Sequence, residues 1–458
     1  MTKWLSTERG EGLWNAVLKG EEFMDSDFQA ALSARVVEVQ STARVPSLTV
    51  GVGVEGVPLA VASVGYADVE NSISATGESS YRIGSITKTF TAALALVLVE
   101  QAELHLDSPV SRYLPGTPFG RLPVRMLLSH SSGLQREAPT DMWQTMHGPS
   151  RTELRELFQH AELVADPGER WHYSNLGYAV LGQIIEEITG QPCDTSITET
   201  LLDPLGLSRT SWTPPSNAVV GYRLDPHIDA VHREPVMDQA SIGVGGQMWS
   251  TPDDLLRWGH VLAGGDATVL PLAVVEKMHT LQVMVDTAGW TRGWGLGLIL
   301  ERRHGRIVAG HTGAMPGFQS ALMLDRGAEL AVVVLANVTR GIKVTDLALE
   351  VLELAAAARQ PKPTQPWHLA QPCPQHIQPV LGSWWSEADE VILRWERDGL
   401  HATLVSDPVA GRTRFIEEAP GRFRAVEGRL QGELLEIDQT SGGVEMRWAT
   451  YPLTRTPR

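Results

Sequence analysis

The stretch RIGSITKTFTA, residues 82–92, decides how this chain is interpreted, because it places a lysine three residues after a serine at the start of an apolar helix. A serine that opens a helix has its hydroxyl near the positive end of the helix dipole, where an oxyanion is also stabilised. Lys88 follows Ser85 by one turn on the same face, within reach of that hydroxyl. A serine hydroxyl attacks carbonyl carbon only when a base takes its proton, and a desolvated lysine can serve. The pattern alone is common, and its structural alternative is a serine cap followed by an ordinary lysine.

Lysine is rare in this sequence, which makes Lys88 more informative. Only six of the 38 basic residues are lysines. Arginine keeps its proton in a protein, whereas a desolvated lysine can become a neutral base. Lys88 lies beside the apolar run FTAALALVLVE, residues 90–100, and this setting favours desolvation.

Two further short stretches carry candidate chemistry. YSN, residues 173–175, follows a Pro-Gly turn and precedes an amphipathic helix expected over 177–189. HTGA, residues 311–314, lies where an expected strand meets a turn. Each alone also has a plain structural explanation: a core aromatic residue beside a turn, or a histidine at a strand end.

Taken together and in this order, these stretches resemble the serine β-lactamase and penicillin-binding-protein superfamily, closest to its class C-like and esterase or D-aminopeptidase branch. The resemblance extends over five longer stretches, two of which contain YSN and HTGA: LLSHSSGL, PGERWHYSNLGYAVLGQIIEEITGQP, LLDPLGLSRT, GVGGQMWSTPDDLLRW and GHTGAMPGFQSALML. The resemblance covers residues 45–340. It implies an α+β fold of the β-lactamase/transpeptidase type, with an antiparallel sheet flanked by helices and an all-helical subdomain.

The resemblance also implies catalytic roles. Ser85 would be the acylated nucleophile, with Lys88 and Tyr173 sharing the duties of general base and general acid. Which of the two is the base stays open, because coupled groups share their titration. Asn175 would hydrogen-bond both the substrate and Lys88.

The same resemblance places a substrate-binding strand at residues 311–314. The backbone N–H groups of Ser85 and Ala314 would form the oxyanion hole. His311, Thr312 and Gly313 would line the strand against which an extended substrate lies. The expected function is therefore a serine hydrolase that cleaves esters, amides or peptide bonds through an acyl-enzyme.

One departure from the family pattern bears on the substrate. Many β-lactamases and D,D-carboxypeptidases have a lysine where this chain has His311, and a neutral histidine holds a substrate carboxylate less well. We therefore expect an esterase or a D-amino-acid peptidase ahead of a true β-lactamase or D,D-carboxypeptidase, with Arg340 as an alternative source of the missing charge. A non-catalytic penicillin-binding sensor or scaffold protein is the alternative from another class.

The chain is expected to hold two domains and a linker. Residues 1–360 would form the catalytic domain, 361–371 a proline-rich linker and 372–458 a small antiparallel β-barrel. Some relatives carry a similar lipocalin-like barrel that shapes the active-site entrance or an oligomer contact, which implies a homo-oligomer as one outcome. Within the first domain, residues 47–54 and 58–64 should form a hairpin. The glycines of GVGVEG, residues 51–56, match a dinucleotide fingerprint only formally, because a strand and no helix follows.

Composition limits the partners. A net charge of −16 disfavours nucleic acid and anionic membranes. The apolar run at 90–99 is too short to cross a bilayer, and the N-terminus lacks a signal-peptide pattern, so a cytoplasmic location is expected. Neither His-Glu-x-x-His nor Cys-x-x-Cys occurs, so we expect no metal and no cofactor. The expected partner is a small-molecule or short-peptide substrate.

Overall fold

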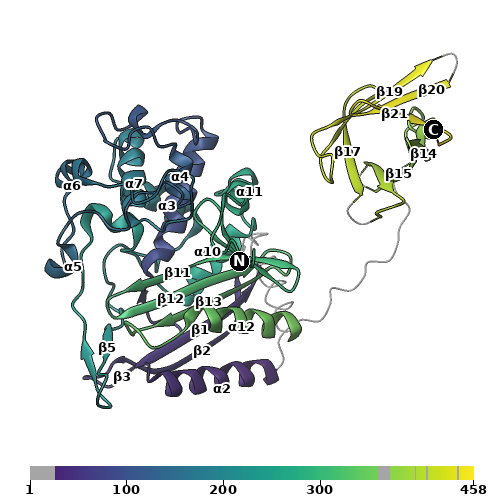
Figure 1. Ribbon diagram of the computed structural model, residues 1–458. Helices are drawn as coiled ribbons and strands as arrows, with labels where there is room; N and C mark the ends of the chain where they lie inside the picture. The colour runs from purple at the N-terminus through teal and green to yellow at the C-terminus, as the bar shows by residue number, and fades with distance from the viewer. Residues whose placement is uncertain (1–25, 359–371, 398, 409–410, 441–442, 458) are drawn as a thin grey trace, which may run out of the picture. The chain divides into compact units, whose positions relative to one another are not determined.

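The computed structural model describes residues 26–358, 372–397, 399–408, 411–440 and 443–457 (Figure 1). The chain divides into two compact units, Met1–Gln360 and Pro361–Arg458. The predicted linker at 361–371 lies outside the described residues, as do residues 1–25.

A nine-stranded antiparallel sheet forms the centre of the larger unit. Its strands are β1 (Ser47–Val54), β2 (Val57–Asp68), β3 (Ile73–Ser74), β8 (Val283–Met284), β9 (Arg292–Trp294), β10 (Ile299–Arg303), β11 (Arg306–Met315), β12 (Phe318–Asp325) and β13 (Leu330–Ala336). Their spatial order is β3-β2-β1-β13-β12-β11-β10-β9-β8. The early strand β1 lies between β2 and the late strand β13. This arrangement confirms the predicted antiparallel sheet and joins strands from both ends of the unit.

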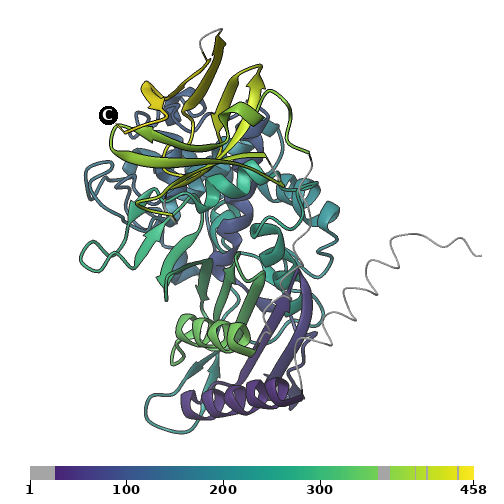
Figure 2. The same cartoon turned by 90° about the vertical axis from the view of Figure 1, so that its right-hand side faces the viewer.

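Two helices from opposite ends of this unit cover one face of the sheet. They are α2 (Ser26–Ala43) and α12 (Val344–Ala358), and they lie side by side beneath the strands (Figure 2). Leu32 of α2 and Val351 of α12 belong to one buried cluster with Val50 and Val332 of the sheet. Alternate residues of a strand point to the same face, so Val50 and Val52 of β1 both face these two helices.

The opposite face of β1 carries glycines because a helix lies close to it. A Cβ added to Gly51 or to Gly53 would lie 3.3 Å from side-chain carbons of Leu256 in α10 (Pro252–Leu262). The glycines of GVGVEG therefore make room for a helix packed on the sheet. The predicted hairpin of β1 and β2 is confirmed, and the dinucleotide interpretation is excluded.

The remaining helices form the predicted helical subdomain beyond this face (Figure 1). They are α3 (Thr87–Glu100), α4 (Val124–Leu128), α5 (Met142–Thr145), α6 (Arg151–Leu157), α7 (Asn175–Thr189), α8 (Cys193–Ile197), α9 (Asp203–Leu205) and α11 (Leu272–His279). Helix α3 is buried on nearly every side, and Phe90 stacks on Trp258 of α10 at a centroid distance of 4.1 Å. Two short two-stranded sheets join β4 (Tyr81–Arg82) to β7 (Trp249–Ser250) and β5 (Tyr222–Leu224) to β6 (Val231–Arg233).

A tight turn separates β9 from β10. The sequence GWGLGLI, residues 293–299, alternates as a single strand would, yet the structure ends β9 at Trp294 and begins β10 at Ile299. Gly297 has φ of +90°, and an added Cβ would lie 2.4 Å from the Cβ of Ala92 in α3. The segment turns back because it packs against α3, a contact distant in sequence.

The second unit is a closed barrel of antiparallel strands, which confirms the predicted barrel. Its strands are β14 (Gly382–Ser386), β15 (Asp389–Glu396), β16 (Gly399–Leu404), β17 (Arg412–Ala419), β18 (Arg422–Ala425), β19 (Leu434–Thr440), β20 (Gly443–Trp448) and β21 (Tyr451–Thr454). Trp384, Phe415, Phe423 and Trp448 are among the buried side chains that form its core.

Candidate active site

Ser85 lies in a short 3-10 turn, Gly84–Ile86, that leads directly into α3. Gly84 enters this turn with φ of +52°, a left-handed conformation that favours glycine. The hydroxyl of Thr87 donates to the carbonyl of Gly84 at 2.7 Å and fixes the start of the helix. The side chain of Ser85 is thereby presented to a cavity at the N-terminal end of a buried helix.

Lys88 is completely buried and contacts the serine. Its Nζ lies 3.1 Å from Ser85 Oγ and donates to the carbonyl oxygen of Gly245 at 2.6 Å. Burial lowers the pKa of Lys88 to about 7, against the opposing effect of the Glu137 carboxylate. An amine with this pKa is largely neutral above pH 7, as a general base must be.

Tyr173 approaches the same serine from the segment that precedes α7. Burial raises the pKa of Tyr173 above its ordinary value, and the neighbouring Ser85 side chain opposes this shift. Lys88 Nζ lies 5.1 Å and the guanidinium carbon of Arg136 lies 5.0 Å from the centre of the Tyr173 ring. The next residue, Ser174, caps α7 by accepting from the backbone N–H of Gly177 at 2.9 Å.

Strand β11 runs beside the serine turn at backbone contact. A Cβ added to Gly84 would lie 2.7 Å from the backbone nitrogen of Ala314, and one added to Gly313 would lie 1.9 Å from the carbonyl oxygen of Ile83. The hydroxyl of Ser320 donates to that same carbonyl at 2.7 Å and ties β12 to the turn. Two glycines thus allow the strand and the serine turn to lie side by side.

His311 lies in β11 and lines the cavity as an uncharged ring. Its Nδ1 lies 2.6 Å from the carbonyl oxygen of Thr312, so Nδ1 carries the proton and Nε2 carries a lone pair. Burial, and then the neighbouring Lys88, lower the pKa of His311 to about 3. Thr312, Gly313 and Ala314 line the same cavity.

Asn175 also lines the cavity, but with a partner that the sequence did not predict. Its Nδ2 donates to Glu137 Oε1 at 2.7 Å. The expected hydrogen bond to Lys88 is not among those between the described residues, because Lys88 Nζ instead contacts Ser85 and Gly245. Glu137 itself was missed. It follows the LLSHSSGL stretch in a loop without helical or strand periodicity. Its closeness to that stretch is the one signal in the sequence that could have drawn attention to it.

The cavity has a volume of about 750 Å³. Its aromatic walls are Trp143, Trp171 and Trp294. Trp249 instead packs on Phe318, and Trp290 is 71% exposed. The cationic residues of the wall are Arg136, Arg292 and Lys343, whereas Arg340, the residue considered from sequence, is not part of the lining.

Within the described part of the chain, no cluster of three His, Cys, Asp or Glu side chains has the arrangement of a metal site. In the same residues no helix combines the length and apolar character needed to cross a membrane.

Comparison with known proteins identifies this chain as a serine hydrolase. Residues 28–357 match the family model described as Beta-lactamase, and the chain belongs to this family. Residues 373–455 match the model described as Domain of unknown function (DUF7586).

Known relatives agree with this assignment. The chain is 30% identical over 368 residues to penicillin-binding protein 4 of Amycolatopsis lactamdurans, covering 74% of this chain and 93% of the relative. The D-amino acid amidase of Ochrobactrum anthropi SV3 with D-phenylalanine bound is 26% identical, with a TM-score of 0.62 over 72% of this chain and 99% of that one. The octameric penicillin-binding protein homologue of Pyrococcus abyssi, at 24% identity, shares the fold with a TM-score of 0.63 over 93% of this chain and 99% of that one.

Proposed function

We propose that this protein hydrolyses esters and amides, peptide bonds included, through an acyl-enzyme formed on Ser85. One observation carries the proposal: Lys88 Nζ lies 3.1 Å from Ser85 Oγ in a fully buried position, and the Tyr173 side chain neighbours the same serine. A nucleophile within hydrogen-bond distance of a base, with a second proton-carrying group beside it, is the arrangement that acyl transfer requires.

In acylation, Lys88 is the better general base. Burial lowers the pKa of Lys88 to about 7, whereas burial raises the pKa of Tyr173, so the neutral amine is more accessible than the phenolate. The neutral amine still donates to Gly245 O, and its lone pair takes the Ser85 proton as Oγ attacks the carbonyl carbon.

Tyr173 and the backbone of β11 complete the proposed reaction. The oxyanion of the tetrahedral intermediate would accept from the N–H groups of Ser85 and Ala314, which the close packing of Gly84 and Gly313 supports. Tyr173 relays the proton to the leaving group. Water then attacks the acyl carbon with the same groups in reversed roles.

The substrate class follows from His311 and from the relatives. An uncharged His311 offers no cation for a substrate carboxylate, which favours esters, amides and short peptides without an essential carboxylate at that position. The similarity to a D-amino acid amidase at 26% identity points the same way.

A fluorophosphonate probe and a panel of p-nitrophenyl esters test this function. We expect a mass adduct on Ser85 in the wild type, ester turnover, and loss of both in Ser85→Ala. No adduct and no turnover in the wild type would reject the acyl-enzyme and favour a binding or scaffold role.

The 30% identity to a penicillin-binding protein favours β-lactam recognition as the second candidate. A fluorescent penicillin would then label Ser85. Nitrocefin would show whether the protein is a β-lactamase or a penicillin-binding sensor. Turnover of nitrocefin far above that of any ester would indicate a β-lactamase, and a stable adduct without turnover would indicate a penicillin-binding sensor.

We further propose that residues 1–360 are the catalytic domain, that 361–371 form the linker, and that the barrel of 372–458 supports a homo-oligomer. Gel filtration of the full chain and of a chain that ends at Gln360 tests the last point, because loss of the barrel should reduce the assembly to a monomer. The cytoplasmic location stays a prediction from the sequence.

A further inference from the structure

The carbonyl oxygen that accepts from Lys88 lies in residues 239–247, the glycine segment. Gly245 ends the 3-10 helix η5 (Ala240–Gly245), and its carbonyl accepts from Lys88 Nζ at 2.6 Å. Gly245 and Gly246 both line the cavity beside the nucleophile. Because a glycine backbone has more conformational freedom than any other, neighbouring residues must fix the position of this carbonyl.

Gln247, which follows the two glycines, ties the glycine segment together through its side chain. Its Oε1 accepts from the backbone N–H of Gln239 at 3.1 Å, and its Nε2 donates to Asp238 Oδ1 at 3.3 Å. The same oxygen of Asp238 accepts from the backbone N–H of Ala240 at 3.0 Å. The Gln247 side chain therefore joins the two ends of the glycine segment.

Arg82 connects the glycine segment to the strand that leads into the nucleophile. It lies in β4, three residues before Ser85, and its Nη2 donates to Gln247 Oε1 at 2.6 Å. At the next position, the backbone N–H of Ile83 donates to the carbonyl oxygen of Met248 at 2.9 Å. Two adjacent hydrogen bonds thus join the nucleophile turn to the end of the glycine segment.

The contact between Arg82 and Gln247 matters because the guanidinium is buried. Arg82 is 2% exposed, its Nε has no hydrogen-bond partner, and Gln247 Oε1 is its one side-chain acceptor among the described residues. Burial lowers the pKa of Arg82 to about 10, against the attraction of Asp238, so the group stays charged at neutral pH. A buried charge that loses its partner is costly, and hydrogen bonds from a charged donor are strong.

We propose that Arg82 and Gln247 form a clamp that positions the carbonyl of Gly245 and, through it, the amine of Lys88. Both are positioning residues, because neither is among the described residues that line the cavity. The amine lies 3.1 Å from Ser85 Oγ, and a fixed acceptor keeps it there in both protonation states. This inference rests on the proposed function and adds two residues to its machinery.

The test changes Gln247, because replacement of the fully buried Arg82 would also disturb packing. Gln247→Met keeps the size of the side chain and removes the acceptor, whereas Gln247→Glu still offers Arg82 an acceptor. Gln282→Met is the matched control. Gln282 Oε1 accepts from Arg125 Nη1 at 3.1 Å, and neither residue is among those that line the cavity in the described part of the chain.

Hydrogen exchange followed by mass spectrometry reports the clamp without any catalysis. We expect exchange over residues 239–247 to become about 10-fold faster in Gln247→Met, because the N–H of Gln239 loses its acceptor and the segment opens more often. Gln282→Met should exchange like the wild type over the same residues. Unchanged exchange in Gln247→Met would overturn the inference.

The rate of fluorophosphonate labelling of Ser85 from pH 5 to 9 reports the effect on Lys88. We expect Gln247→Met to slow labelling by about 10- to 100-fold and to lower the apparent pKa of the profile, because the ammonium form loses a fixed acceptor. Gln247→Glu should slow labelling clearly less, and Gln282→Met should leave the rate and the profile unchanged. An equal loss in both Gln247 variants, or an unshifted profile in Gln247→Met, would overturn the positioning role.

The variants leave every other titratable or charged group beside Lys88 in place. These groups are Glu137, Arg136, His130, His311, Tyr173 and Tyr178. If the wild type is not labelled at any pH while exchange still rises in Gln247→Met, the proposed function is rejected, and the clamp is a structural contact without the positioning role.

Discussion

His130 fixes the position of Tyr173: it accepts hydrogen bonds from the residues on either side of Tyr173, and its ring packs on the phenol ring. The carbonyl of His130 accepts from the backbone N–H of His172 at 2.7 Å, and its Nδ1 accepts from the N–H of Ser174 at 3.1 Å. The imidazole and phenol ring centres are 4.2 Å apart. Burial lowers the pKa of His130 well below its usual value, so the ring is neutral with its proton on Nε2. His130 is thus a positioning residue for the phenol.

Replacement of His130 should reduce catalysis more strongly when the new side chain cannot accept the hydrogen bond from the backbone N–H of Ser174. His130→Leu leaves that N–H buried and unpaired, which costs about 1–3 kcal/mol, and frees the segment that carries Tyr173. His130→Asn offers an oxygen acceptor and tolerates the positive φ of +55° at this position. We expect kcat for ester hydrolysis to fall by about 10- to 100-fold in the leucine variant and clearly less in the asparagine variant. Equal loss in both would contradict the positioning role.

The pH dependence of acylation should follow Lys88. The folded-state pKa of Lys88 is about 7, and the neutral form is the base. Therefore kcat/KM for an uncharged ester should rise with pH through about 7 and then level off. Initial rates from pH 5 to 9 measure this profile. A kcat/KM that falls with rising pH across this range would show that the protonated lysine is required.

Substitution of Glu137 and of Arg136 should shift the pH profile of kcat/KM in opposite directions. The Glu137 carboxylate stabilises the ammonium form of Lys88, whereas the Arg136 guanidinium destabilises it. Glu137→Gln should shift the apparent pKa of kcat/KM downwards, and Arg136→Gln should shift it upwards. A shift of the same sign in both variants would assign the profile to a group other than Lys88.

Much of the fold was predictable because its signals are local. The apolar run after Lys88, the glycine that ends α7 at Gly190 and the continuous apolar run of β13 each indicate their element within a few positions. Their assembly also brings Ser85, Tyr173 and His311 to the wall of one cavity, with Lys88 in contact with Ser85.

The remaining features depend on contacts between distant parts of the chain. Gly297 turns because Ala92 lies against it, and no property of residues 293–299 alone indicates this contact. Folding places Glu137 beside Asn175 and in the cavity wall. A single acidic residue in a loop carries no periodicity, so its role becomes visible only in three dimensions.

The approach of β11 to the serine turn should tolerate no side chain at Gly313. A Cβ there would lie 1.9 Å from the carbonyl oxygen of Ile83, so Gly313→Ala must displace the strand and with it the backbone N–H of Ala314. We expect kcat to fall by about 100- to 1,000-fold, the range for loss of an oxyanion donor. Gly327→Ala is the control, because its Cβ would meet only Asp325 Oδ1 at 3.4 Å. Full activity in Gly313→Ala would argue against Ala314 as a donor.

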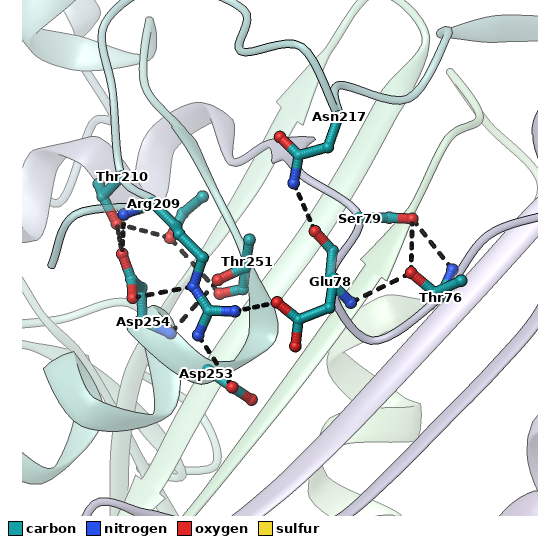
Figure 3. A network of polar contacts seen from close by, with 10 residues as sticks. Thr76, Glu78, Ser79, Arg209, Thr210, Asn217, Thr251, Asp253 and Asp254 are labelled. Atoms are coloured by element: carbon teal, nitrogen blue, oxygen red, sulfur yellow. Dashed lines mark hydrogen bonds and ion pairs between the residues drawn. The ribbon is translucent and has the colours of Figure 1, made fainter.

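Away from the cavity, Arg209 joins three carboxylates from two parts of the chain (Figure 3). It contacts Glu78 in an ion pair, and it reaches Asp253 at 2.9 Å and Asp254 at 3.8 Å in the first turn of α10. Asp254 is nearly buried, and burial raises its pKa even though Thr210 and the backbone N–H of Arg209 donate to it. Removal of Arg209 would take away a positive charge that offsets the cost of burying the Asp254 carboxylate.

Arg209→Met should therefore destabilise the catalytic unit in a pH-dependent way. We expect a loss of about 1–2 kcal/mol at pH 7, since partly exposed ion pairs contribute less than buried ones. The change raises the folded-state pKa of Asp254 further above its unfolded value, so the added cost is present at neutral pH and disappears as the pH falls below about 4, where both states are protonated. Thermal unfolding of wild type, Arg209→Met and the exposed control Arg121→Met at pH 7 and pH 4 measures it. A difference in Tm between wild type and Arg209→Met that is as large at pH 4 as at pH 7 would assign the loss to packing of the arginine stem and not to its charge.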